Sequence, residues 1–230
     1  MKNKIIILLI SLLCATAKAQ RSEIFVSTIA SLQIIPNNNW LEPLPVVNLA
    51  STDNQIVIAF DELSHDYHRY TYTVQHCEAD WTPSEELLES DYVDGFASGN
   101  TIDDYEQSTN TNTLYTHYKL TLPNDRCRLK LSGNYTVTIY DEDNDNMPVL
   151  KACFMVTEQS MKSSMTQTTN TDIDINNSHQ QVSINLNYNS INVTSPATQI
   201  KTVVLQNGRW DNCVHNPKPQ YIKADGMIWD

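Results

Sequence analysis

Two segments place histidine or carboxylate side chains at spacings that could hold a metal ion. The run Asp141-Glu142-Asp143-Asn144-Asp145-Asn146 begins like an EF-hand loop, with oxygen ligands at alternate positions. Asn146 then stands where the turn glycine belongs, and Ala152 stands where the closing glutamate belongs. His65 and His68 lie on a polar turn with no third ligand nearby in the sequence. We therefore predict a solvated hairpin turn at 141–146 and no metal site.

The sequence contains none of the common catalytic motifs. None of the five glycines forms a phosphate-binding loop, no serine lies in a G-x-S-x-G elbow, and no H-E-x-x-H occurs. We predict that the protein is not an enzyme and has no cofactor. An enzyme fragment whose catalytic part lies beyond residue 230 is an open alternative.

The stretch 80–106 is rich in acidic and aromatic residues and contains no lysine or arginine. A few aromatic anchors within a polar rim are typical of protein–protein interfaces, and an acidic surface favours a basic partner. A solvated acidic loop explains the composition nearly as well. The predicted partner-binding residues are Asp80, Trp81, Asp91, Tyr92, Asp94, Phe96, Asp103, Asp104, Tyr105 and Glu106.

A secreted carbohydrate-binding module is the alternative function that these aromatic residues allow. Trp81, Tyr92, Phe96 and Tyr105 would then form a stacking platform, with coplanar rings on an open face. We expect instead that residues 80–114 form a long loop that packs onto its domain through Trp81 and Phe96.

Apolar residues that alternate with polar ones predict that β-strands carry this loop. The alternation occurs at 56–60, 70–74, 118–122, 127–131 and 135–139, with turn residues between the runs. This pattern predicts an all-β protein with an immunoglobulin-like antiparallel β-sandwich. Leu131-Ser132-Gly133-Asn134-Tyr135 resembles a tyrosine corner, in which the tyrosine hydroxyl bonds back to the preceding crossover.

A helix signal interrupts the strands once. Thr82-Pro83-Ser84-Glu85 has the form of a capping box with proline at the first helical position. We expect one or two helical turns from there through Leu87 and Leu88.

Composition predicts four segments. Lys2 and Lys4, the apolar run 5–14 and Ala17-Lys18-Ala19 predict a signal peptide at 1–19, so we expect an exported protein. The first sandwich is expected at 20–158, a polar linker at 159–171 and a second β-sandwich domain at 172–230. Only about three clear strands are expected after the linker, at 173–175, 182–188 and 200–205. Since a sandwich needs around seven, we expect the second domain to be incomplete.

The net charge limits the partners of the mature chain, and the cysteine spacing indicates the state of its thiols. Removal of 1–19 removes three lysines, so the mature chain has 12 basic and 27 acidic residues and a net charge of 12 − 27 = −15. This charge disfavours nucleic acid and anionic lipid. We expect mostly buried thiols, with one disulfide as an alternative, at Cys77, Cys127, Cys153 and Cys213.

Several longer motifs together resemble one protein family. His76-Cys77-Glu78-Ala79-Asp80-Trp81-Thr82-Pro83-Ser84, Tyr92-Val93-Asp94-Gly95-Phe96, and residues 115–125 and 205–211 resemble the plug protein of the bacterial type IX secretion system. The resemblance spans about residues 23–229, in order and with similar spacing.

The resemblance implies a non-catalytic periplasmic protein associated with the outer membrane. Its implied partner is the outer-membrane translocon barrel of the secretion system, whose periplasmic opening it would block against leakage. The implied fold is an immunoglobulin-like domain followed by a second β domain, and no catalytic residue carries over to this chain.

Overall fold

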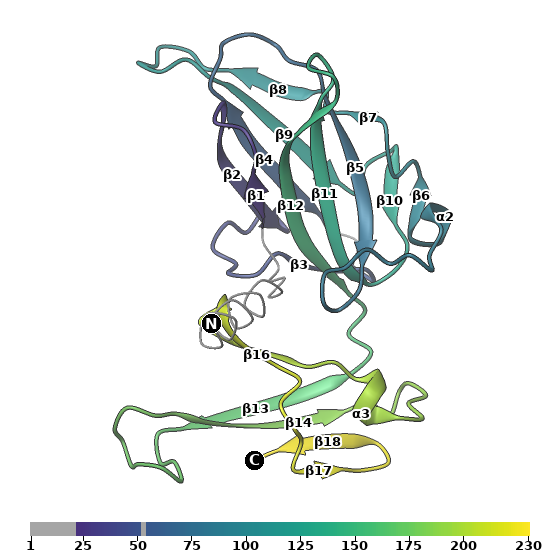
Figure 1. The fold of residues 1–230 in the computed structure, drawn as a ribbon, viewed down its shortest axis with the longest axis vertical. Coiled ribbons are helices and arrows are strands. Elements are labelled where there is room, and N and C mark those ends of the chain that lie inside the picture. Colours follow the sequence, from purple (N-terminus) through teal and green to yellow (C-terminus); the bar gives the residue numbers. More distant parts are fainter. Residues whose placement is uncertain (1–21, 52–53) are drawn as a thin grey trace, which may run out of the picture. The chain divides into compact units, whose positions relative to one another are not determined.

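The computed structural model describes residues 22–51 and 54–230 (Figure 1). The signal peptide predicted at 1–19 lies outside these residues. The chain divides into two compact units, Met1–Thr157 and Glu158–Asp230. In the part of the chain that the structure describes, no helix has the length and apolar character needed to span a membrane.

The first unit is a sandwich of two β-sheets (Figure 1). One sheet has the order β2-β4-β9-β8, with bounds Ile29–Pro36, Ile56–Glu62, Thr116–Leu122 and Asp104–Gln107. The other has the order β1-β12-β11-β5-β7, with bounds Glu23–Ile24, Met147–Thr157, Gly133–Asp141, Tyr70–Cys77 and Asn100–Thr101, and β3 (Val46–Asn48) pairs with β12. These orders correspond to the A-B-E-D and G-F-C sheets of an immunoglobulin fold, which confirms the predicted class.

The predicted alternations lie in strands whose apolar faces meet in one core. Phe60 of β4 stacks on Tyr118 of β9 with ring centroids 5.3 Å apart. Tyr70 of β5 packs edge-on against both rings, at 5.4 and 4.8 Å. Rings of this size bury large apolar areas, so this cluster, in which Tyr70 packs across from the other sheet, contributes much of the stability of the sandwich.

The tyrosine corner is present at the start of β11. The hydroxyl of Tyr135 donates a hydrogen bond to the carbonyl oxygen of Leu131 at 2.7 Å. Tyr135 is fully buried, and its ring stacks on Phe154 of β12 with centroids 5.5 Å apart. The prediction from residues 131–135 is therefore confirmed.

The prediction of a helix beginning at Thr82 is wrong. Pro83 forms an antiparallel bridge with Cys77, and the Thr82 hydroxyl donates to the Asp80 carboxylate at 2.6 Å rather than capping a helix. The helix is α2 (Glu89–Tyr92), where the Leu88 amide donates to the Asp91 carboxylate at 2.9 Å. The region 80–114, expected as a loop, contains α2, β6 (Val93–Gly95), β7 and β8, and β6 pairs with β10 (Cys127–Leu129).

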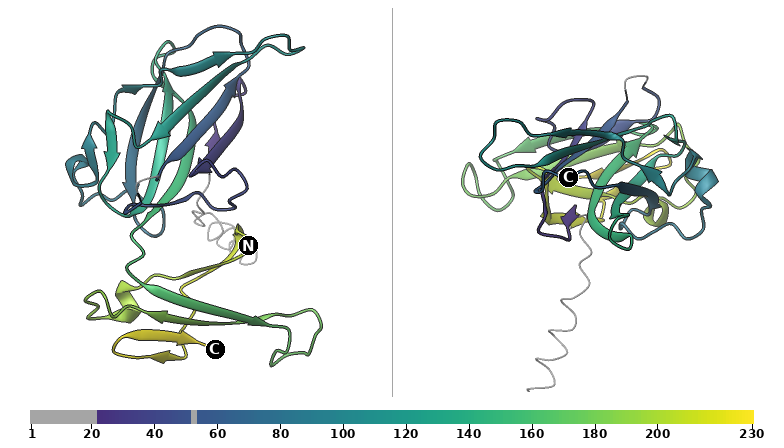
Figure 2. Two further views of the ribbon diagram at one scale, coloured as in Figure 1. Left: turned by 180° about the vertical axis from the view of Figure 1, so that it is seen from behind. Right: turned by 90° about the horizontal axis from the view of Figure 1, so that it is seen from above.

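The second unit contains a four-stranded sheet of order β13-β14-β18-β17 and a separate pair, β15–β16 (Figure 2). The sheet strands are Lys162–Thr168, Gln181–Asn187, Gly226–Trp229 and Tyr221–Ile222, the pair is Val203–Gln206 with Arg209–His215, and helix α3 is Pro196–Gln199. A small core forms around Tyr188, Ile200, Met227 and Trp229.

Two expectations for the second unit are wrong. The segment 159–171 is not only a linker, because β13 pairs with β14 along its whole length. All seven β13 residues are exposed, so no apolar alternation marks this strand in the sequence. Ile173 and Ile175, expected in a strand, lie in the exposed connection between β13 and β14.

The cysteines that the structure describes are free thiols. Cys77, Cys127 and Cys153 are buried and Cys213 is partly exposed, which confirms the expectation of mostly buried thiols.

Candidate interaction surfaces

The predicted partner-binding residues lie on several elements of the first unit. They begin at the turn after β5, continue through α2 and β6, and end on the edge strand β8, and Figure 1 shows α2 and β6 at the right of this unit and β8 at its top. We call the acidic members of this set the acidic edge, which consists of Asp80, Asp91, Asp94, Asp103, Asp104 and Glu106. All six are exposed.

Basic residues from a different part of the chain lie within the acidic edge. Arg128 of β10 is the register partner of Asp94, and Lys119 of β9 is the register partner of Asp104. The Arg126 guanidinium lies 3.2 Å from the Asp103 carboxylate. The acidic edge is therefore a surface of mixed charge, although residues 80–106 contain no lysine or arginine.

The four aromatic residues of this stretch do not form a common platform. Tyr92 is only 6% exposed and packs against His76 and Tyr135 with centroids 5.8 and 6.2 Å apart. Trp81 is partly buried in the turn after β5. Tyr105 lies on β8, where it meets Tyr67 at 4.7 Å. The stacking platform of the carbohydrate-binding alternative is therefore not supported.

The expectation that Phe96 packs the long loop onto the sandwich is wrong. Its side chain is 70% exposed, so it does not pack the loop onto the sandwich. The buried apolar residues of this region are Tyr92, Val93, Ala97 and Ile102. These residues anchor the segment and leave Phe96 available at the surface.

A second exposed surface, absent from the sequence predictions, is the connection between β2 and β3. Here Trp40 is 77% exposed and Leu41 is 70% exposed. We call residues 37–45 the Trp40 loop. The sequence does contain a signal for this loop. Asn37-Asn38-Asn39 precede Trp40, and Pro43 and Pro45 follow it, so these residues predict a turn with a tryptophan that belongs to no predicted strand.

Hydrogen bonds hold the Trp40 loop in a defined shape. The amide of Asn37 donates to the carbonyl oxygen of Gln55 at 2.8 Å, and the Asn39 amide donates to that of Pro36 at 2.8 Å. The Leu41 amide donates to the Asn39 side-chain oxygen at 3.2 Å. A turn ordered in this way loses little conformational entropy when its apolar side chains become buried in an interface.

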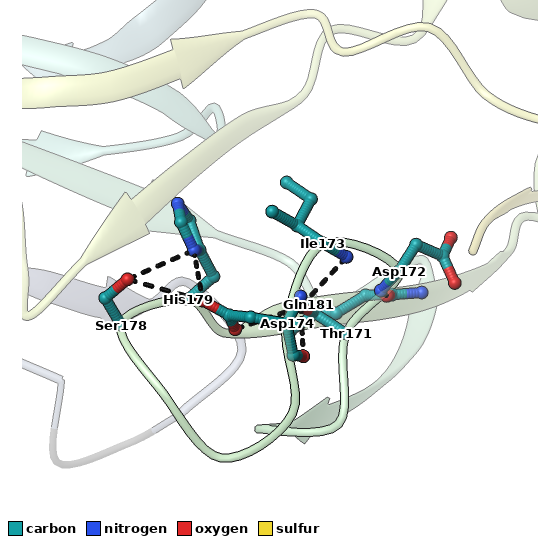
Figure 3. Close-up of polar contacts among 7 residues, drawn as sticks. All are labelled: Thr171, Asp172, Ile173, Asp174, Ser178, His179 and Gln181. Atoms are coloured by element: carbon teal, nitrogen blue, oxygen red, sulfur yellow. Dashed lines mark hydrogen bonds and ion pairs between the residues drawn. The ribbon is translucent and has the colours of Figure 1, made fainter.

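A serine, a histidine and an aspartate come together between β13 and β14, as Figure 3 shows. The Nδ1 atom of His179 lies 2.7 Å from Asp174 Oδ2 and 3.3 Å from Ser178 Oγ. In a catalytic triad the two ring nitrogens of histidine contact the aspartate and the serine separately. Here one nitrogen contacts both, so the cluster lacks triad geometry.

This cluster instead stabilises its loop. The Asp174 amide donates to the Thr171 hydroxyl at 2.9 Å, and that hydroxyl donates to the Asp174 carbonyl oxygen at 2.7 Å. The hydrogen bond with His179 is the main reason why the pKa of the Asp174 carboxyl lies below its ordinary value.

The fold defines an immunoglobulin-like β-sandwich protein. Residues 29–158 match the family described as "Type 9 secretion system plug protein 1st domain", and the chain belongs to this family. The family is a secretion-system plug domain and is not a known enzyme family. The resemblance seen in the sequence is thereby confirmed.

The chain is also similar to a solved structure, the crystal structure of a hypothetical protein from Parabacteroides merdae. The TM-score is 0.83 and the sequence identity is 40%, over 90% of this chain and 51% of that chain. This chain therefore spans about half the length of that protein. No curated protein sequence matches.

Proposed function

We propose that this protein is a non-catalytic periplasmic plug that binds the periplasmic opening of the type IX outer-membrane translocon and prevents leakage through it. The observation that carries this proposal is the family match, which covers nearly all of the first sandwich. The protein would act by occupying the opening and would perform no chemistry. Reversible interfaces of this kind bury on the order of 1,200 to 2,000 Å² around a few aromatic anchors.

Two exposed surfaces are the candidates for this contact. The first is the acidic edge together with Trp81, Tyr105 and Phe96, whose charges would set the rate and the salt dependence of association. Tyr92 belongs to this surface only as a buried support. The second is the Trp40 loop, where Trp40 and Leu41 could fill a pocket on the barrel rim. Tryptophan is among the residues that most often dominate binding energy.

A deletion in a cell that carries the secretion system tests the role. Without the plug, an open barrel should admit a large antibiotic that the outer membrane normally excludes. Sensitivity should rise, most clearly when the other exit-side partner of the barrel is also absent, and complementation by the wild-type gene should reverse it. Unchanged permeability in both backgrounds would refute the proposal.

Co-purification with the translocon tests the two surfaces separately. The Trp40 loop is tested by Trp40→Ala with Leu41→Ala, and its matched control is Ile173→Ala in the second unit, where the side chain is 77% exposed. The acidic edge is tested by lysine substitution of Asp91, Asp94 and Asp104. Its control is lysine substitution of three exposed acids of the second unit, Glu158, Asp172 and Asp225.

If one test variant no longer co-purifies with the translocon while its control still does, the substituted surface is the contact surface. Full retention by both variants would remove both surfaces. Binding of glycans by the purified protein, with no retention of the translocon, would favour the carbohydrate-binding alternative.

A further inference from the structure

Three side chains that could bind a metal ion meet at one end of the first sandwich. His68 precedes β5, Asp141 is the last residue of β11, and Asp143 lies in the turn between β11 and β12. Among the described residues, one ligand atom from each of the three lies within 4.8 Å of the others. His68 has no third ligand nearby in the sequence because its partners lie more than seventy residues further along the chain.

The two chain segments are already joined by one bond from a backbone amide to a side chain and by one bond between backbone groups. The Arg69 amide donates to Asp143 Oδ2 at 2.9 Å, and the Glu142 amide donates to the Arg69 carbonyl oxygen at 3.0 Å. The Arg69 guanidinium also pairs with the Glu142 carboxylate at 2.9 Å. The relative position of His68 and the two aspartates is therefore set by the fold and does not depend on an ion.

Tyr118 holds the backbone of His68 from the other side. The His68 amide donates to the Tyr118 hydroxyl oxygen at 2.7 Å, and this hydroxyl donates to the His68 carbonyl oxygen at 3.1 Å. The imidazole ring lies along Tyr70 with centroids 6.2 Å apart. Neither ring nitrogen of His68 has a hydrogen-bond partner among the described residues, so a nitrogen can serve as a ligand without breaking a protein contact.

The charge around the three side chains favours a cation. Arg69 is the neighbouring positive charge, and it is paired with Glu142. Asp141, Asp143 and the adjacent Asp145 remain as negative charges. Their combined field attracts a divalent ion, and the partial exposure of the site leaves room for water ligands.

The spacing fits a small ion after modest side-chain rotation. An ion bound at about 2.0 to 2.2 Å from each ligand atom places those atoms about 3 to 4 Å from one another. The observed limit of 4.8 Å is slightly wider than this range. An imidazole nitrogen suits first-row transition ions better than Mg²⁺ or Ca²⁺, which prefer oxygen ligands alone.

We propose that His68, Asp141 and Asp143 form a binding site for a divalent first-row transition ion, such as Zn²⁺ or Mn²⁺. The ion links the connection between β4 and β5 to the β11–β12 turn. It thereby cross-links the crossover between the two sheets to a hairpin of one sheet. Binding to the folded state alone raises thermal stability as the ion concentration rises. This inference is independent of the proposed function.

The test is ion titration of the untagged mature chain after treatment with EDTA and dialysis. Calorimetry with ZnCl₂ and MnCl₂ should show one ion per chain, bound more tightly than CaCl₂ or MgCl₂, with a rise in melting temperature. His68→Gln, Asp141→Asn and Asp143→Asn should each weaken binding by about tenfold or more, since loss of even an outer-shell partner costs 10- to 100-fold. Zn²⁺ should also shift the imidazole resonances of His68 in wild-type protein, which identifies the ligand without any substitution.

Two controls separate this site from other metal ligands. Asp145→Asn removes the same charge from the same turn without removing a ligand, so it should weaken binding far less than the three ligand substitutions do. Cys213→Ser should leave the affinity unchanged, although Cys213 Sγ lies 3.1 Å from His215 Nε2 and this pair could itself bind Zn²⁺. The proposal is overturned by absence of Zn²⁺ and Mn²⁺ binding at millimolar concentration, by tighter binding of Ca²⁺, or by binding that survives His68→Gln and is lost with Cys213→Ser.

Discussion

Asp94 on β6 lies directly opposite Arg128 on β10. The same segment of basic residues supplies Arg126, which pairs with Asp103 at 3.2 Å. A stretch whose charged residues are all acidic in the sequence thus becomes a surface of mixed charge in the folded protein. Exposed pairs of this kind contribute little to stability, so their main influence is on the electric field that a partner meets.

Reversal of these basic charges should change association more than folding. The double variant Arg126→Glu with Arg128→Glu should lose at most about 1 kcal/mol per pair, as is usual for exposed pairs. If the acidic edge meets a basic rim, this variant should bind the translocon faster at low salt, and the gain should vanish at high salt. Stopped-flow or surface-based kinetics at two salt concentrations measures this. A slower association than that of Lys162→Glu, an exposed control in the second unit, would show that the basic residues contact the partner.

Removal of the Tyr135 hydroxyl should destabilise the first unit. Tyr135→Phe leaves the ring in place but deprives the Leu131 carbonyl oxygen of its hydrogen bond, at an expected cost of about 1 to 3 kcal/mol. Urea denaturation followed by intrinsic fluorescence gives the value. Tyr67→Phe is the matched control, because Tyr67 is 46% exposed, and it should cost much less. Equal costs for the two variants would contradict the structural role of the tyrosine corner.

Trp40 should be dispensable for folding, whereas Phe60 should not be. Trp40→Ala should change the free energy of unfolding by no more than about 0.5 kcal/mol, as is usual for exposed positions. Phe60→Ala should cost about 3 to 5 kcal/mol, because Phe60 is fully buried against Tyr70 and Tyr118. The two denaturation midpoints test this contrast. A large loss with Trp40→Ala would mean that the Trp40 loop is structural.

The cysteines should differ sharply in reactivity in the native protein. Burial raises the pKa of Cys127 to about 11, and it also raises that of Cys77. Since only the thiolate reacts, an alkylating agent at pH 8 should label partly exposed Cys213 first. Mass spectrometry of peptides after brief labelling, with and without urea, measures the order. Early labelling of Cys127 without urea would contradict its burial.

The loop between β13 and β14 should depend on pH through Asp174. Its pKa is held below 3.8, chiefly by the hydrogen bond with His179. A lowered pKa in the folded state stabilises the loop above the unfolded value, and this stabilisation is lost as the pH falls through the lower folded value. Amide exchange at residues 171–178 should therefore become less protected below about pH 4. The comparison variant His179→Ala should lower protection at neutral pH, and equal protection in the two proteins would contradict this role.

Much of the first unit could be predicted from local patterns. Alternating apolar residues located β4, β5, β9 and β11, because each of these strands buries one face in the core. The tyrosine corner could also be predicted from the sequence, because its hydrogen-bond donor and acceptor are only four residues apart. A prediction from local sequence is wrong where tertiary contacts favour a different backbone conformation. The capping sequence at Thr82 forms no helix because the backbone of 83–84 pairs with 76–77 instead.

The sequence by itself determined the all-β class, the strand positions of the first sandwich and the family to which the chain belongs. Only the tertiary structure decided which residues share a surface. It placed Arg126 and Arg128 among the acids, exposed Phe96 and Trp40, buried Tyr92, and brought His68 to Asp141 and Asp143. The physical reason is that strand pairing and sheet packing join residues far apart along the chain, so local periodicity fixes the face of a side chain but not its neighbours.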